Sequence, residues 1–152
     1  MSDIRVRTAK AEDRDAIAGF NKAMAMETEG KELSEAMVAE GTKGLLGNRD
    51  YGFYVVAENG GEVIGSLMVT YEWSDWRNGV FWWVQSVYVR PEYRRGGAFK
   101  KLYEYVRQAA SERDDVCGLR LYVEKDNERA QVVYDRLGMQ KTNYLLYEDL
   151  LQ

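Results

Sequence analysis

The sequence predicts an α/β fold in which a mixed, mostly antiparallel central sheet is flanked by helices. Three observations support this prediction. Apolar residues alternate at strand spacing in several segments, the turn residues Asn59-Gly60-Gly61 separate two of them, and an amphipathic helical pattern follows the strongest strand. A tight turn joins antiparallel strands, whereas a strand, a helix and a strand in succession give a parallel crossover. The first half should therefore be antiparallel and the second half should contain crossovers.

The length and charge of the chain limit the class of protein. Its 152 residues suffice for one domain with a substantial core, so we expect a single domain over residues 1–152. The net charge of −4 gives no general attraction to nucleic acid. No stretch approaches the roughly 20 apolar residues of a membrane helix, and the N-terminus lacks the apolar core of a signal peptide. We expect a cytoplasmic protein that binds neither nucleic acid nor membranes.

The chain contains no histidine. This excludes Ser-His-Asp and Cys-His catalysis and removes the commonest zinc ligand, so we expect no metal cofactor. Proton transfer then falls to Tyr, Glu, Asp, Lys or water. The single cysteine, Cys117, cannot form an internal disulfide, and its neighbours Val116 and Leu119 indicate a buried thiol at the start of a strand.

The first half of the chain predicts an edge strand, two helices and a hairpin. Residues 4–8 alternate as a strand does, a helix runs to about residue 26, and a second helix begins after Ser34. Residues 51–58 and 62–72 form the two strands of the hairpin. The helical residues expected to face inward are Ile17, Phe20, Met24, Met37, Val38 and Leu45.

The second half begins with a polar, Trp-rich loop and then the strongest strand. Residues 80–89 are mostly β-branched and aromatic, and Pro91 ends the run. The elements expected after it are a helix over residues 97–113, a strand over 119–124, a short helix ended by Gly138, and a strand over 142–148.

A glycine loop joins the strongest strand to the helix behind it. A helix start presents unpaired N–H groups and partial positive charge, and Gly96 and Gly97 let an anion approach the backbone closely. Nearby Arg94, Arg95 and Lys100 add positive charge. The chain has neither the nucleoside triphosphate motif G-x-x-x-x-G-K-[ST] nor the dinucleotide motif G-x-G-x-x-G. A pyrophosphate ligand of another class fits the loop best.

The chain resembles the GCN5-related N-acetyltransferase superfamily over nearly its full length. The family motif [Q/R]-x-x-G-x-[G/A] corresponds to residues 94–99, and its second motif, an Asn followed by Ala and Tyr on a short helix that ends in Gly, corresponds to residues 127–138. The chain departs from the first motif at Phe99, where the family has a small residue. We expect the Phe99 side chain to turn into the core beside Leu102 and Tyr103.

The resemblance implies acetyl-CoA as the acyl donor, with no metal. The backbone amides of residues 95–100 would cradle its pyrophosphate, and the edge of residues 84–89 would bond the pantetheine arm as an added strand does. Tyr134 would be the general acid that protonates the leaving thiolate, with a core tyrosine as the alternative. Asn127 would bond the pantetheine or cap the helix. The implied cofactor-binding residues are Val87, Tyr88, Val89, Arg94, Arg95, Gly96, Gly97, Ala98, Phe99, Lys100 and Asn127.

No general base stands out, because Gln85 and Ser86 occupy the positions where the family often has a carboxylate. An acidic and aromatic acceptor pocket would suit a small cationic amine through charge and cation–π contact. The residues expected to line it are Glu27, Glu29, Glu72 and Trp76, beside Trp73, Trp82 and Trp83. Three alternatives remain open: a protein N-terminus or lysine as acceptor, a non-catalytic acyl-CoA-binding or regulatory module, and a structural or interaction protein. A homodimer is also compatible with the sequence.

Overall fold

The computed structural model describes residues 3–152. These form two compact units, one that ends at Leu121 and one that begins at Tyr122, and each is described by itself. The first unit contains a five-stranded sheet in the order β1-β2-β3-β4-β5. Its first four strands pair antiparallel, and β5 pairs parallel to β4. The predicted mixed, mostly antiparallel α/β fold is therefore confirmed.

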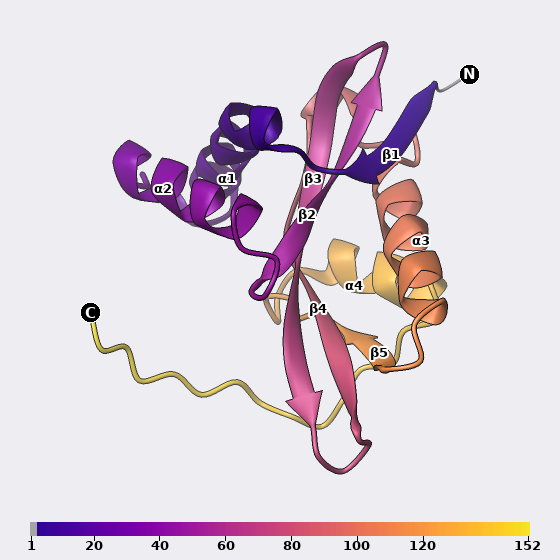
Figure 1. Cartoon of the computed structure of the whole chain (residues 1–152). Coiled ribbons are helices and arrows are strands. Elements are labelled where there is room, and N and C mark those ends of the chain that lie inside the picture. Colours follow the sequence, from indigo (N-terminus) through magenta and orange to yellow (C-terminus); the bar gives the residue numbers. More distant parts are fainter. Residues whose placement is uncertain (1–2) are drawn as a thin grey trace. The chain divides into compact units, whose positions relative to one another are not determined.

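The elements of the first unit follow the predicted order (Figure 1). They are β1 (Ile4–Thr8), η1 (Ala11–Asp13), α1 (Arg14–Glu29), α2 (Glu35–Leu46), β2 (Gly52–Asn59), β3 (Glu62–Ser74), β4 (Gly79–Val89), η2 (Pro91–Tyr93), α3 (Ala98–Ser111) and β5 (Val116–Arg120). None of the helices described in residues 3–152 is long and apolar enough to cross a membrane.

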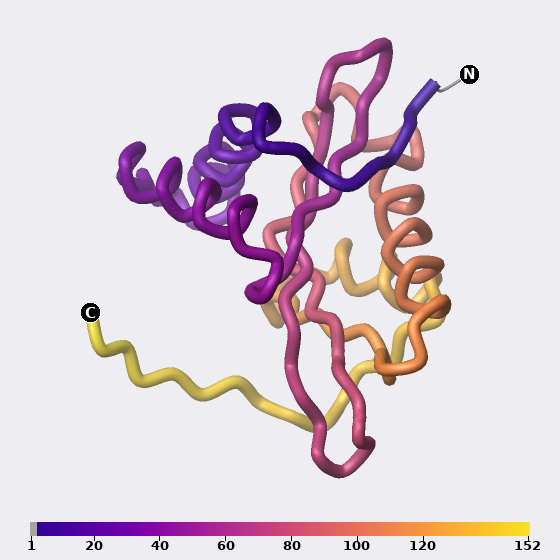
Figure 2. Tube along the Cα trace, in the orientation of Figure 1, coloured from indigo at the N-terminus to yellow at the C-terminus, as the bar shows by residue number. Residues whose placement is uncertain are grey.

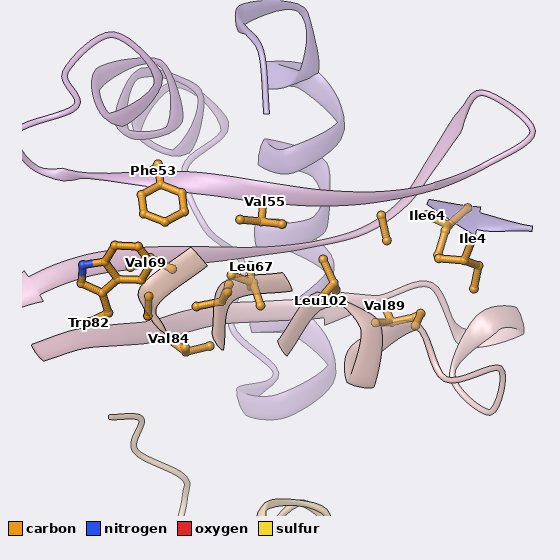
Figure 3. Close-up of a cluster of buried hydrophobic side chains, with 14 residues drawn as sticks. Ile4, Phe53, Val55, Ile64, Leu67, Val69, Trp82, Val84, Val89 and Leu102 are labelled. Carbon is orange, nitrogen blue, oxygen red and sulfur yellow. The ribbon is translucent and has the colours of Figure 1, made fainter. Parts of the chain in front are cut away.

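Helices cover both faces of the sheet, with α1 and α2 on one face and α3 on the other (Figure 1). Strand β2 shows the consequence, because its side chains alternate between two cores. Phe53 and Val55 belong to the core under α3, which Figure 3 shows, whereas Tyr54 and Val56 pack with Ile17 on the opposite face. Burial on both faces explains why β2 is a nearly continuous apolar run rather than an alternating one.

Helix α2 begins where the sequence predicts, since the Ser34 side chain accepts a hydrogen bond from the Met37 N–H. Met37 itself does not face inward as expected. Its side chain is 74% exposed, and the inward face of α2 instead carries Val38, Thr42 and Leu45. These three lie at i, i+4 and i+7, and Thr42 is buried because its hydroxyl donates to the Val38 carbonyl one turn earlier.

The β3–β4 hairpin is longer than predicted. Trp73 lies in β3 rather than in a loop, and the connecting turn is confined to residues 75–78. The tube in Figure 2 follows both strands to this turn. Trp73 pairs with Val80 across the ladder, so cross-strand pairing extends the strands through a segment whose polar residues indicated a loop.

Strand β5 lies earlier in the sequence than expected, over Val116–Arg120 instead of residues 119–124. Its position is determined by pairing, because Val80 of β4 aligns with Val116 and Trp83 aligns with Arg120. Cys117 therefore lies within the strand, but its side chain is exposed rather than buried. Strand β5 is paired with β4 along one edge only, among the strands that the structure describes, so it is less covered than β2 or β3.

The second unit contains α4 (Glu128–Arg136). Gly138 adopts φ of +89°, and Met139 N–H donates to the Tyr134 carbonyl, which closes the helix as predicted. The strand expected over residues 142–148 is not formed. Its apolar residues, including Tyr144 and Leu145, are exposed, and no described strand pairs with it. Strand propensity without a neighbouring strand to pair with does not produce a strand.

Candidate functional site

Strand β4 carries one extra residue opposite β3. Ser66 pairs with Tyr88 and Met68 with Gln85, so Leu67 alone faces the two residues between them. Ser86, the first of these two, has φ of +51°, in the left-handed region that residues other than glycine seldom adopt. A bulge of this kind bends its strand and increases the local twist. The bulge was not predicted, because no glycine marks it in the sequence.

Beyond the bulge, β4 presents an edge that pairs with no described strand. Strand β5 pairs with β4 from Val80 to Trp83 and no further. The Arg90 N–H donates to the Ile64 carbonyl of β3, so by alternation the N–H and C=O of Val89 face away from β3. Among the described strands, none occupies this side of residues 84–89. An extended ligand can pair with this edge as an additional strand, beside the Arg94 side chain that already donates to the Val89 carbonyl.

The glycine loop turns the chain from β4 into α3. The 3-10 turn η2 starts it, and the Gly96 N–H then donates to the Tyr93 carbonyl at 3.2 Å. Gly97 is the N-cap of α3, with φ of +80°. A side chain there would meet no atom within 4 Å, so glycine is needed for the backbone conformation and the space in front of the loop is open. An anion can approach the first amides of α3 through this space.

The first turn of α3 has an unusual charge. It contains Lys100 and no acidic residue, whereas the first turns of α1, α2 and α4 contain Asp15, Glu35 and Glu128. Helices generally place acidic side chains at this end because the helix dipole is positive there. In α3 the dipole, the unpaired amides and the lysine all favour an anion from outside the chain.

Phe99 does not obstruct this helix start. Its side chain packs against the core under α3, and its ring lies 6.2 Å from that of Tyr103, which is buried like Leu102. Ala98, the residue before it, is completely buried. The prediction that Phe99 turns inward is confirmed, and its backbone N–H remains part of the helix start.

Arg94 is held against the end of β4 rather than extended into solvent. Its Nε donates to the Val89 carbonyl at 2.7 Å, and its Nη2 donates to Glu27 of α1 at 2.8 Å. The guanidinium carbon also lies 5.2 Å from the centre of the Tyr88 ring. Its charge is therefore largely balanced by Glu27 at 2.8 Å, whereas Lys100 lies 3.9 Å from Glu104 and Arg95 is exposed, so these two are better placed to attract a phosphate.

The three carboxylates expected in one acceptor pocket have different surroundings. Glu27 pairs with Arg94, whereas Glu72 accepts hydrogen bonds from Trp83 Nε1 at 3.0 Å and from Arg120 Nη1 at 2.8 Å. Glu72 lies six residues along β3 from Ser66, the partner of Tyr88, which is about 20 Å at strand spacing. Glu27 and Glu72 therefore do not share one pocket. Glu29, the last residue of α1, is exposed.

The tryptophans expected beside those carboxylates are also dispersed. Trp82 is buried in the core under α3, with its ring 5.2 Å from that of Phe53 (Figure 3). Trp76 lies in the β3–β4 turn and is 87% exposed, and Trp73 is exposed near it. Trp83 differs from these three, since its Nε1 donates a hydrogen bond to the candidate carboxylate of Glu72.

In the second unit, Asn127 and Tyr134 lie on α4. The Asn127 side chain caps this helix, since its Oδ1 accepts from the Ala130 N–H at 3.1 Å. Tyr134 is half-buried, and burial raises the pKa of its hydroxyl above the ordinary value of 10.0. The phenol is therefore protonated at neutral pH, as a proton donor must be. Within residues 3–152, no group of His, Cys, Asp and Glu side chains could hold a metal ion.

Comparisons with known proteins agree with this geometry. The sequence profile of the Acetyltransferase (GNAT) family matches residues 17–139. A crystal structure of a possible acetyltransferase from Clostridium difficile 630 has 44% identity and a TM-score of 0.92, with 98% of each chain covered. A predicted acetyltransferase from Clostridium acetobutylicum, described with acetyl-CoA, has 20% identity and a TM-score of 0.78, with 97% of each chain covered. No curated protein matches the chain.

The chain belongs to the GNAT acetyltransferase family. It is thus an acyl-CoA-dependent N-acyltransferase, and its central sheet with flanking helices is the GNAT fold of the similar structures. A ribosomal-protein-alanine N-acetyltransferase from Brucella melitensis biovar Abortus 2308 shares this fold at 16% identity, with a TM-score of 0.79 over 98% of this chain and 99% of that one.

Proposed function

We propose that this enzyme transfers an acetyl group from acetyl-CoA to a primary amine, and that the amine is a small cation. The observation that carries the proposal is the start of α3, where open space, a left-handed Gly97 and a first turn with Lys100 but no acid favour a pyrophosphate. The unpaired edge of residues 84–89 gives the pantetheine arm backbone partners.

The reaction balances without a metal. The neutral amine nitrogen attacks the thioester carbonyl, the carbon–sulfur bond of the tetrahedral intermediate breaks, and the amine nitrogen loses a proton to solvent water, from which Tyr134 is reprotonated after each turnover. The leaving thiolate gains a proton, and we assign this donation to Tyr134, whose raised pKa keeps its hydroxyl protonated. The products are an N-acetylated amine and free coenzyme A. Val87 and Val89 are the proposed backbone partners of the pantetheine, and Asn127 acts as helix cap.

Two features support a small cationic acceptor over a neutral one. The chain is acidic, with a net charge of −4, and Glu29 is an exposed carboxylate at the end of α1. A protein N-terminus is the second candidate acceptor, and the ribosomal-protein-alanine acetyltransferase that shares the fold suggests that it be included in any test. A non-catalytic acyl-CoA-binding module would bind the cofactor without releasing thiol.

The proposal is tested by release of free thiol from acetyl-CoA in the presence of small diamines, neutral amines and short peptides with free N-termini. We expect the diamines to give the highest kcat/KM. Release with peptides alone would replace the small amine by a protein acceptor. Binding of acetyl-CoA without release of thiol on any amine would instead favour the non-catalytic module.

A matched pair of variants at Gly97 tests the cofactor site itself. Asp and Asn have nearly the same shape and both tolerate the left-handed conformation, so they differ mainly in charge. We expect Gly97→Asp to weaken binding of coenzyme A about tenfold more than Gly97→Asn does, because a repulsion of about 1.4 kcal/mol between the carboxylate and the pyrophosphate in this open, solvated space is a tenfold change in affinity. Equal affinities of the two variants in calorimetric titrations would contradict a pyrophosphate at this loop.

A further inference from the structure

Glu27 connects α1 to the glycine loop through a single cluster. Both of its carboxylate oxygens accept from Nη2 of Arg94, at 2.8 and 3.1 Å. Arg94 is at the same time bonded through Nε to the Val89 carbonyl. The guanidinium of Arg94 lies over the Tyr88 ring. The ring of Phe20, on α1, also stacks with the Tyr88 ring, with 5.2 Å between the ring centres. Phe20 and Glu27, about two turns apart on α1, thus both contact the junction of β4 with the loop.

The electrostatics of the cluster are mutual. Hydrogen bonding from Arg94 is the largest influence on Glu27 and, with a smaller contribution from Tyr88, lowers the pKa of the carboxyl below 4.5. Burial and the neighbouring Glu27 raise the pKa of the Tyr88 hydroxyl above 10.0. At neutral pH the carboxylate is therefore charged and the phenol is neutral, which is the combination that satisfies all three side chains.

The position of Arg94 in the chain makes this cluster relevant to the cofactor. Arg94 is three residues before Gly97, and η2 ends at Tyr93 immediately before it. Because Arg94 is bonded both to the Val89 carbonyl and to Glu27, its backbone position at the start of the loop is fixed. This in turn restricts the orientation of the backbone amides that follow it. A loop ordered before its ligand arrives binds with a smaller loss of entropy.

We propose that Glu27 is a positioning residue for the acyl-CoA: it holds Arg94 against the end of β4 and thereby orders the glycine loop for the pyrophosphate. This inference rests on the proposed binding of the cofactor at that loop. It assigns Glu27 to the cofactor and not to the acceptor amine, and it leaves Glu29 of α1 and Glu72 of β3 as the carboxylate candidates for the amine.

The test uses Glu27→Gln, Arg94→Gln and the double variant, with dissociation constants for coenzyme A measured by calorimetry on the full chain. We expect each single variant to weaken binding roughly threefold to tenfold, and the double variant to be no weaker than either, because the two side chains act as a unit. Glu40→Gln, an exposed glutamate on α2, makes the same change of charge and should leave the dissociation constant unchanged.

Three outcomes would overturn the proposal, and each is distinct. If Arg94 contacts the phosphates directly and Glu27 merely offsets its charge, Glu27→Gln should tighten the binding of coenzyme A. If Glu27 recognises the amine, Glu27→Gln should raise the KM for the amine and leave the dissociation constant for coenzyme A unchanged. If the losses in the two single variants simply add in the double variant, the residues do not act together.

Two further measurements separate positioning from charge and from the proposed function. Glu27→Asp keeps the charge, but its side chain is one methylene too short to reach Arg94. We therefore expect it to weaken the binding of coenzyme A as Glu27→Gln does. A Glu27→Asp variant with wild-type affinity for coenzyme A would show that the contact with Arg94 is not needed. Melting temperatures identify any variant that fails to fold. If the wild-type protein binds no coenzyme A, the proposed function itself is refuted. If the wild-type protein and Glu27→Gln bind coenzyme A equally well, only the positioning role of Glu27 is refuted.

Discussion

Tyr134 is the residue on which the proposed chemistry depends most. Burial raises the pKa of its hydroxyl above 10.0, and this has two opposing effects on a general acid. The proton is present at every physiological pH, but it is given up less readily than from an ordinary phenol. Donation to a thiolate whose conjugate acid has a pKa of about 8.5 is still feasible when the proton moves as the carbon–sulfur bond breaks.

We expect Tyr134→Phe to fold normally, to keep its affinity for acetyl-CoA and to lower kcat by about 10²- to 10⁴-fold, because the substitution removes only the donor oxygen. Wild-type activity should persist as pH rises and fall only as pH passes the raised pKa of Tyr134, since the acid must be protonated. Tyr147→Phe, at an 89% exposed tyrosine, is the control and should keep full activity. An unchanged kcat with a lower melting temperature would assign Tyr134 to packing.

Individual site residues were predictable from sequence only where the backbone determines their role. The role of Gly97 was predictable, because a glycine between a strand and an amphipathic helix indicates a left-handed backbone conformation at the start of the helix. The partners of Glu27 and Glu72 were not, because each ion pair joins residues far apart in the sequence. Composition indicated acidic residues near tryptophans, but the register of β3 against β4 places Glu72 about 20 Å along the sheet from Tyr88, beside which Arg94 and Glu27 lie.

Strand β4 is the element that organises the site, and the bulge at Ser86 is its decisive feature. Upstream of the bulge β4 pairs on both sides, and downstream it pairs with β3 alone among the described strands. The sequence predicted this strand and the helix after it well, since both have strong patterns. It did not predict the bulge or the exact position of β5, because both depend on how neighbouring strands align rather than on local propensity.

The left-handed backbone of Ser86 gives a test at this scale. A β-branched residue tolerates φ of +51° poorly, so Ser86→Val should destabilise the fold by about 1–2 kcal/mol, or several degrees in melting temperature. Ser86→Gly removes that strain and should melt at or above the wild-type temperature. We also expect Ser86→Val to bind coenzyme A more weakly, since a straightened β4 would alter the free edge. Thermal unfolding and calorimetry check both effects, and a Ser86→Val protein as stable as wild type would argue against the bulge.

For the whole molecule, the decisive property is that both faces of the sheet are buried. The core under α3 and the smaller core under α1 and α2 share β2, so the helix that starts the anion site and the helix that carries Glu27 are fixed to one framework. The fold class was predictable from sequence because these cores require strong apolar periodicity. The segment over residues 142–148 was predicted wrongly because its pattern is equally strong but it has no described strand to pair with.

One buried charge joins the first elements of this framework. Asp13 is 6% exposed, and its carboxylate accepts from the Arg7 guanidinium at 2.8 and 3.0 Å and from the Lys10 N–H at 2.7 Å. Arg7 also pairs with Glu58 of β2. Burial alone would raise the pKa of Asp13, but the hydrogen bonds from Arg7 and Lys10 outweigh it and lower the pKa below 3.8. The charged form of Asp13 therefore stabilises the folded state.

The resulting stability should depend on pH in one direction. A carboxyl whose folded-state pKa is lowered contributes fully above its unfolded pKa near 3.8 and loses that contribution as pH falls through the folded value. We expect Asp13→Asn to lower the free energy of unfolding at pH 7 by about 2 kcal/mol, because a hydrogen bond to a charged group contributes about 1.5–3 kcal/mol. For a chain of this length that is a decrease of about 4–8 °C in melting temperature, and the gap to wild type should narrow below pH 3.8. Asp15→Asn removes a 91% exposed carboxylate paired with Arg14 and should change the melting temperature little at either pH. Melting curves of the three proteins at pH 7 and pH 3 decide the matter, and a gap that is as wide at pH 3 as at pH 7 would show that Asp13 acts through its shape rather than its charge.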